Sequence, residues 1–263
     1  MVIINKDKCI GCGTCIEDCV ANNIEIQDKK AVIKRGCVQC GHCVAICPRN
    51  AVSIPEYDMD EVEEYCAESF RINPRTVLHH IKFRRSIRRY KEKKIQKYVL
   101  EQLLQAGRYT ATAHNNQNCH FVFVQDELAV LKFGVWQYIE KITSTEEGKA
   151  SSKLRPYASF LRRWKADPQN DFLFRNAPTV LFITSDWEMD AGLAAQNIET
   201  MAVSLGMGTL YNDYLASIVN GCEEMKKWLG IEGKEIRICM LIGYPEKVYQ
   251  RTAPRKKANV IWK

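Results

Sequence analysis

Two hydrophobic patterns alternate along residues 94–243 and predict different elements. Apolar residues recur every three or four positions in three segments, which predicts helices. These segments are 94–106, 190–205 and 213–229. Short continuous apolar runs in three other segments predict core strands. These runs are 121–124, 179–184 and 237–243. Gly107 and Gly230 directly follow the first and last helical segments and are typical stop residues.

A reversal of charge precedes this region. Residues 56–68 contain seven acidic residues and no lysine or arginine, whereas residues 82–97 are strongly basic. Asp58 and Glu61 form a capping-box pattern, which predicts a helix that ends before Pro74. The two charged stretches either help to dock two domains or are simply two solvated surfaces.

Eight of the 12 cysteines lie in two tight groups near the N-terminus. The first group has the spacing C-x2-C-x2-C-x3-C, and the second repeats it 28 residues later, followed by Pro48. The groups are Cys9, Cys12, Cys15 and Cys19, then Cys37, Cys40, Cys43 and Cys47. Self-similarity at a fixed period indicates a duplicated structural unit.

The spacing within each group suits a four-iron, four-sulfur cluster. Three thiolates within seven residues can converge on one face of a cluster, while the fourth lies beyond that loop and is expected to bind the other cluster. The predicted ligands are Cys9, Cys12, Cys15 and Cys47 for one cluster and Cys37, Cys40, Cys43 and Cys19 for the other. Gly11, Gly13 and Gly41 permit the tight backbone path. Two zinc sites are the alternative, but zinc usually takes separated C-x2-C pairs.

Over residues 1–57 these motifs resemble the bacterial two-cluster ferredoxins. The resemblance implies a small ferredoxin-like domain that carries two 4Fe-4S clusters. One departure is Val20, which stands where the family usually has proline, as at Pro48 in the second repeat. This change removes no cluster ligand.

Composition and charge exclude several classes of function. The hydrophobic share of 46% is sufficient for an ordinary buried core. The formal charge of +7 counts the cysteines as neutral, and each of two loaded clusters would carry a charge of about −2, which brings the protein closer to neutral. A nucleic-acid partner is therefore not expected. The sequence has no apolar run of bilayer length and no signal peptide, which predicts a cytoplasmic protein without membrane insertion.

Two polar motifs in the second part of the chain are candidates for ligand binding. Arg84, Arg85, Ser86 and Arg88 could supply bidentate and hydroxyl hydrogen bonds to a phosphate, although such a basic run is equally consistent with solvated surface. A polar loop over 112–118 enters the strand predicted at 121–124, and loops at strand ends often meet ligands.

Four motifs over residues 76–263 resemble the nitroreductase-like flavoprotein family. They are R-R-S-x-R, S/T-x-x-N-x-Q, A-A-Q-N-I ending at L-G-x-G-T, and P-R-K-K, in the order and approximate spacing of the family. The resemblance implies an α+β domain with a mixed or antiparallel sheet flanked by helices. It also implies a homodimer that binds FMN at the dimer interface.

The resemblance assigns roles to individual residues. Those expected to hold the FMN phosphate and ribityl chain are Arg84, Arg85, Ser86 and Arg88, with Arg255 and Lys257 closing on the same phosphate. Those expected to reach or line the flavin are Asn115, Gln117, Leu210, Tyr211 and Asn212. His114 is a candidate proton donor, but a histidine near a loop is more often a hydrogen-bonded surface residue.

Two departures from the family pattern bear on the substrate. Asn118-Cys119 stands where the family often has Pro-Trp, and Tyr211-Asn212-Asp213 stands where small residues are common. The walls of the pocket therefore differ from those of familiar nitro-group reducers. Residues 132–174 either cap the substrate face or form a helical excursion that packs on its own domain.

The sequence thus predicts a ferredoxin domain over 1–57, an acidic helical connector over 58–75 and an FMN domain over 76–263. No G-x-G-x-x-G dinucleotide motif is present. We expect a cytoplasmic oxidoreductase of an anaerobe. An external low-potential donor is expected to reduce the clusters, and the clusters to reduce FMN. FMN is then expected to reduce an electrophilic small molecule of nitro, quinone or enone type. The alternatives are an electron-transfer protein without its own small substrate and a flavin-modifying or redox-sensing protein.

Overall fold

A computed structural model describes residues 1–263, and contacts between residues divide the chain into two compact units. The first unit contains residues 1–72 and 113–116, and the second contains 73–112 and 117–263. One hydrophobic cluster belongs to the first unit and two belong to the second, and none of the three combines residues of both. Each unit is therefore stabilised by apolar contacts of its own.

The first unit is built from two similar halves. Its main elements are β1 (Ile3–Ile4), α1 (Thr14–Glu17), β2 (Ile24–Gln27), β3 (Lys30–Ile33), α2 (His42–Ala45) and β4 (Val52–Ser53). β1 pairs with β4, and β2 pairs with β3, both antiparallel. Each pair joins one strand from each half, so the two halves are interlocked rather than placed side by side.

The segment after the two halves differs from the predicted connector helix. It forms a 3-10 turn (Met59–Glu61), a short helix α3 (Ala67–Phe70) and a longer helix α4 (Pro74–Phe83). The prediction of one helix from Asp58 was wrong because the backbone is extended at Val62 and again at Cys66. Pro74 starts a helix instead of following one, since proline is favourable in the first turn and Asn73 caps that turn by accepting from the N–H of Arg75.

The second unit consists of a four-stranded sheet and helices. The strands are β5 (His120–Val124), β6 (Thr179–Thr184), β7 (Gly208–Tyr211) and β8 (Ile236–Gly243). Besides α4, the helices are α5 (Lys97–Arg108), α6 (Leu128–Ser144), α7 (Glu146–Ala150), α8 (Arg155–Ala166), α9 (Glu188–Ser204), α10 (Asp213–Asn220) and α11 (Glu223–Trp228). A 3-10 turn over Ala113–Asn115 belongs to the first unit. The strand order is β5-β6-β8-β7, and every neighbouring pair is antiparallel.

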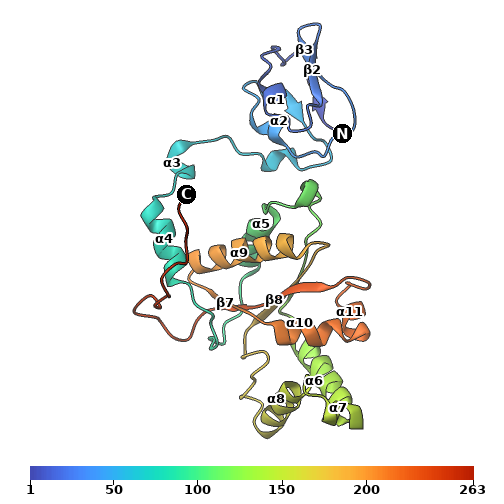
Figure 1. The fold of residues 1–263 in the computed structure, drawn as a ribbon, viewed down its shortest axis with the longest axis vertical. Coiled ribbons are helices and arrows are strands. Elements are labelled where there is room, and N and C mark those ends of the chain that lie inside the picture. The colour runs from blue at the N-terminus through green and yellow to red at the C-terminus, as the bar shows by residue number, and fades with distance from the viewer. The chain divides into compact units, whose positions relative to one another are not determined.

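Both faces of this sheet are buried, because successive residues of its central strands point to opposite sides. Val180 and Phe182 of β6 pack with residues of α6, α8, α10 and α11, whereas Leu181 and Ile183 pack with residues of α5 and α9. Figure 1 shows α5 and α9 on one side of the sheet and α6 and α10 on the other. Residues 132–174 lie mainly in α6, α7 and α8, whose buried residues join the first of these two clusters.

Three details of the second unit differ from the sequence prediction. The predicted helix over 213–229 is divided into α10 and α11 at Gly221 and Cys222. Gly107 is not a stop residue but a buried position within α5, where an added Cβ would lie 2.9 Å from both Ile198 and Phe121. Strand β7 was not predicted. No helix of the chain combines the length and apolar character that a membrane crossing requires.

Candidate functional site

Four predicted cluster ligands line a single pocket in the first unit. Cys9, Cys12 and Cys15 come from the first repeat and Cys47 comes from the second, and the pocket has an empty volume of about 370 Å³. Burial raises the pKa of the Cys15 thiol, and the neighbouring Cys12, Cys47 and Cys9 raise it further. Thiolates that converge in this way repel one another, and bound iron would offset that repulsion. The donor set therefore fits an iron–sulfur cluster.

The second set of cysteines is also crowded. Burial raises the pKa of the Cys43 thiol to about 11, and charge on Cys37 and Cys40 adds to the shift. These three residues surround the start of α2 in the same way as Cys9, Cys12 and Cys15 surround the start of α1. Cys19, the predicted fourth ligand, lies just after α1 and accepts a hydrogen bond from the N–H of Asn23 at 3.3 Å.

The backbone around the cysteines repeats with the same 28-residue shift as the sequence. The N–H of Ala51 donates to Cys47 Sγ at 3.3 Å, which matches the bond from Asn23 to Cys19. Gly13 and Gly41 both have left-handed φ angles, 84° and 78°, before their short helices. Backbone N–H groups that point at sulfur stabilise the thiolate form, as cluster ligation requires.

The two halves differ in charge near the first cysteine of each set. Lys30 Nζ donates to the carbonyl of Cys9 at 2.6 Å, whereas the equivalent residue of the other half, 28 positions earlier, is Val2. The pKa of Cys9 is lowered chiefly by the N–H of Ala31, and the charge of Lys30 lowers it further. The first cysteine set therefore has a fixed positive charge beside it, whereas the second set has the apolar Val2 at the equivalent position.

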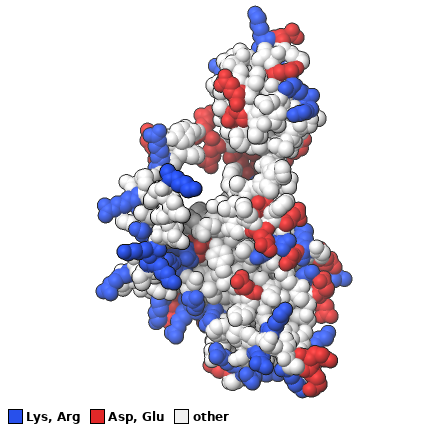
Figure 2. Space-filling view, viewed as in Figure 1, with Lys and Arg blue, Asp and Glu red and all other residues white.

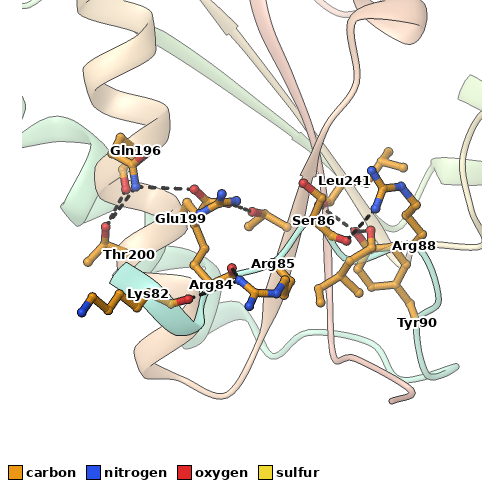
Figure 3. A network of polar contacts seen from close by, with 12 residues as sticks. Lys82, Arg84, Arg85, Ser86, Arg88, Tyr90, Gln196, Glu199, Thr200 and Leu241 are labelled. Atoms are coloured by element: carbon orange, nitrogen blue, oxygen red, sulfur yellow. Dashed lines mark hydrogen bonds and ion pairs between the residues drawn. The ribbon is translucent and has the colours of Figure 1, made fainter. Parts of the chain in front are cut away.

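In the second unit, the predicted phosphate-binding run begins directly after α4. Arg84 Nη1 lies 3.1 Å from Glu199 Oε1, and the same oxygen accepts from Thr209 Oγ1 at 2.8 Å (Figure 3). Glu199 is 1% exposed and lies on the buried face of α9 with Ala195 and Ala202. Glu199 was not among the site residues predicted from the sequence. The signal for it was a carboxylate at helical spacing within an otherwise apolar stripe.

The run continues alongside β7. Ser86 forms an isolated parallel bridge with Thr209, and the N–H of Ile87 donates to the Thr209 carbonyl at 2.9 Å. An added Cβ at Gly208 would lie 2.1 Å from Ile87, so only glycine allows this close approach. The arginine run and the predicted flavin-lining residues of β7 are thus brought together.

The residues at the end of β7 have structural roles. Asn212 Oδ1 accepts from the N–H of Leu215 at 3.1 Å and caps α10, while its Nδ2 donates to the Leu173 carbonyl at 2.7 Å. Burial raises the pKa of the Tyr211 hydroxyl, and the carboxylate of Glu199 adds to this effect. Leu210 and Tyr211 are half-buried.

The other predicted flavin residues are distributed more widely. Asn115 belongs to the first unit, where its Nδ2 donates to the carbonyls of Val38 and Gln39, each at 3.0 Å. His114, Asn115 and Gln117 all have left-handed backbone conformations. The C-terminal segment contacts the arginine run through the carbonyl of Arg251, 3.5 Å from Arg85 Nη2. The exposed Arg255 and Lys257 follow that contact in the chain.

Comparison with known families and relatives gives a consistent result for both parts of the chain. Residues 81–244 match the nitroreductase family, and residues 1–48 match the 4Fe-4S dicluster domain. A protein of Methanothermobacter thermautotrophicus named NADH dehydrogenase/NAD(P)H nitroreductase is 22% identical over 185 residues, which are 66% of this chain and 80% of that protein. Ferredoxin-2 of Desulfomicrobium norvegicum is 52% identical over 31 residues, which are 12% of this chain and 52% of the ferredoxin.

Solved structures share the fold of the second unit. A nitroreductase with bound FMN from Bacteroides fragilis has a TM-score of 0.58 at 23% identity, over 73% of this chain and 98% of its own. A second FMN-bound nitroreductase, from Desulfitobacterium hafniense, has a TM-score of 0.56 at 20% identity, over 73% of this chain and all of its own. The α+β fold with an antiparallel sheet between helices is therefore confirmed.

Proposed function

Because the chain belongs to the nitroreductase family, we propose that it is an FMN-dependent oxidoreductase fed with electrons by two 4Fe-4S clusters held in its first unit. The main support is the pocket lined by Cys9, Cys12, Cys15 and Cys47, which come from both repeats of the dicluster domain. An external low-potential donor supplies the electrons. The final acceptor is an electrophilic small molecule of nitro, quinone or enone type.

Each cluster is bound by the first three cysteines of one repeat and the fourth cysteine of the other. Cys9, Cys12, Cys15 and Cys47 hold one cluster, and Cys37, Cys40, Cys43 and Cys19 hold the other. The support for the first set is its shared pocket. The support for the second set is that three features recur after 28 residues. These are the short helix, the left-handed glycine before it, and the hydrogen bond from a backbone N–H to the sulfur of the fourth cysteine.

The arginine run and β7 form part of the flavin site. Asn115 and Gln117 supply further contacts, and Arg255 and Lys257 of the C-terminal segment supply the rest. The protein binds FMN as a homodimer. Arg84, Arg85, Ser86 and Arg88 bind the phosphate and ribityl chain, and the Glu199 carboxylate orients Arg84 for this role. Leu210, Tyr211 and Asn212 place backbone along the ring. When bound, FMN exchanges one or two electrons and so joins one-electron carriers to two-electron chemistry.

The test is anaerobic stopped-flow reduction of the fully loaded protein by a low-potential donor. A variant in which Cys9, Cys12 and Cys15 are all replaced by serine is expected to reduce its flavin much more slowly than the wild type. Cys66→Ser is the matched control, because Cys66 is an exposed cysteine outside both sets. Equal rates of flavin reduction in the triple variant and the wild type would overturn the proposal.

A further inference from the structure

Two arginines from different segments pack against the same aromatic ring in the second unit. Arg175 Cζ lies 3.6 Å from the ring centroid of Phe172, and Arg163 Cζ lies 5.6 Å from it. Arg163 belongs to α8, whereas Arg175 belongs to the loop that leads into β6. Phe160 stacks on Phe172 at 4.6 Å, which fixes the plane of the shared ring. The two guanidinium groups are thus positioned by one small aromatic cluster.

The segment that follows Arg88 of the predicted cofactor-binding run approaches the segment that follows Arg175. The two segments meet at Gly243, where an added Cβ would lie 2.6 Å from Pro178 and 2.8 Å from Tyr90. Burial lowers the pKa of Arg175, and the positive charges of Arg88 and Arg163 lower it further. Positive charges from two other segments thus oppose the charge of Arg175.

The loop holds Arg175 at this position. The N–H of Arg175 donates to the carbonyl of Asp171 at 2.8 Å, and the next side chain, Asn176, donates to the Gln169 carbonyl at 2.9 Å. Arg175 and Asn176 both have left-handed φ angles, 55° and 53°. Such conformations cost on the order of 1 kcal/mol or more each and persist only where the surroundings enforce them. The backbone at Arg175 is therefore constrained, and the Phe172 ring positions its guanidinium.

Protein groups provide little compensating negative charge. Asp171 is the carboxylate whose charge opposes the repulsion at Arg175, but it is shared. Its Oδ2 lies 3.1 Å from Lys132 Nζ, and its Oδ1 accepts from the N–H of Phe174 at 2.8 Å. No side-chain hydrogen bond joins the Arg175 guanidinium to another protein group. Lys132 and Arg175 thus share one carboxylate, an arrangement that a bound anion would stabilise.

Figure 2 shows that lysine and arginine also gather on the side of the second unit formed by α4 and the C-terminal segment. That surface is exposed, whereas the group around Phe172 combines partial burial, aromatic packing and a constrained loop. Planar guanidinium groups match the two oxygens of a carboxylate or the oxygens of a phosphate. We propose that Arg163 and Arg175 bind a carboxylate or phosphate group of the electron acceptor. The identity of this ligand as the acceptor rests on the proposed function.

The test compares two probes that differ in charge, 4-nitrobenzoate and 4-nitrobenzamide. Each is titrated calorimetrically into the oxidised, FMN-loaded protein. The wild type is expected to bind the carboxylate about tenfold more tightly than the amide, equivalent to about 1.4 kcal/mol. Arg175→Gln and Arg163→Gln should each remove most of this preference and leave the affinity for the amide unchanged. Arg163→Gln guards against misfolding of the constrained loop, because Arg163 is an exposed helical residue.

Arg162→Gln is the matched control, since Arg162 is the exposed neighbour of Arg163 on the same helix. It should retain the preference for the carboxylate. A wild type that binds both probes equally, or neither, would overturn the proposal. The proposal would also be overturned if Arg175→Gln bound FMN more weakly but riboflavin as tightly as the wild type does. Riboflavin lacks the phosphate, so this result would show that the bound anion is the cofactor's own phosphate. If the wild type prefers the carboxylate but its reduced flavin reduces neither probe, the result supports the anion site and contradicts the proposed function.

Discussion

At the scale of single residues, the two cysteine sets show how one backbone path tolerates different side chains. Gly11 and Gln39 occupy equivalent positions and have similar left-handed φ angles, 65° and 53°. An added Cβ at Gly11 would lie 2.3 Å from the carbonyl oxygen of Lys29, so glycine is required there for space as well as for conformation. The repeat therefore preserves geometry more strictly than residue identity.

Lys30 is expected to make the two clusters electrochemically unequal. Reduction adds negative charge to a cluster, and the ammonium bound to the Cys9 carbonyl stabilises that charge. Lys30→Met should lower the midpoint potential of one cluster and leave the other unchanged, as measured by redox titration with detection by electron paramagnetic resonance. Lys34→Met, at an exposed lysine of the same unit, is the control and should shift neither cluster. Equal shifts of both clusters in Lys30→Met would contradict this account.

Glu199 should contribute to stability through its buried ion pair. Its carboxylate accepts from Arg84 and Thr209, and Gln cannot replace the charge. Glu199→Gln is expected to cost about 2 kcal/mol of unfolding free energy, less than for a fully buried pair because the Arg84 side chain is 29% exposed. Glu188→Gln should change stability by less than about 0.5 kcal/mol, because that carboxylate is 84% exposed. Chemical denaturation of both variants measures the difference.

At the scale of elements, the sequence predicted best what local burial determines. The predicted strands over 121–124, 179–184 and 237–243 agree with β5, β6 and β8 to within one residue at each end. Their apolar runs are buried in the sheet, so hydrophobicity alone identifies them. β7 could not be predicted in this way, because it is short, begins with glycine and is held mainly by pairing with β8.

Long-range contacts limited the prediction of the candidate site in the same way. The arginine run and the cysteine spacing are local patterns and are visible in the sequence. Glu199 acquires its role only from Arg84, a partner 115 positions away that no local pattern reveals. The break at Gly221 and the helix start at Pro74 likewise depend on competing local signals that tertiary packing resolves.

Replacement of glycine by alanine should have opposite effects on stability at two positions, because only one of them lies where the arginine run approaches β7. Gly208→Ala should destabilise the second unit by about 1–3 kcal/mol and weaken FMN binding, because the new Cβ would overlap Ile87 and displace the run. Gly192→Ala in α9 should instead stabilise the protein by up to about 1 kcal/mol, since no atom lies within 4 Å of its added Cβ and alanine favours the helix. Thermal unfolding together with flavin fluorescence titration separates the two effects. Equal behaviour of the two variants would refute the packing argument.

At the scale of the whole molecule, the chain combines two units with different sources of stability. The second unit has two hydrophobic clusters that cover both faces of its sheet. The buried cluster of the first unit contains only nine residues, and three of them are the proposed ligands Cys9, Cys15 and Cys43. A small core that consists partly of metal ligands depends on the metal for its fold.

Removal of iron from the full chain should therefore affect the units unequally. Anaerobic treatment with a chelator under mildly oxidising conditions is expected to abolish the calorimetric transition of the first unit and its protection from hydrogen exchange. The second unit should keep its own transition and its flavin absorption, because its hydrophobic clusters contain no residue of the first unit. Loss of both transitions together, or release of the flavin with the iron, would show that the two units form one cooperative structure. Before stripping, the protein should contain about eight irons per chain, as two 4Fe-4S clusters require.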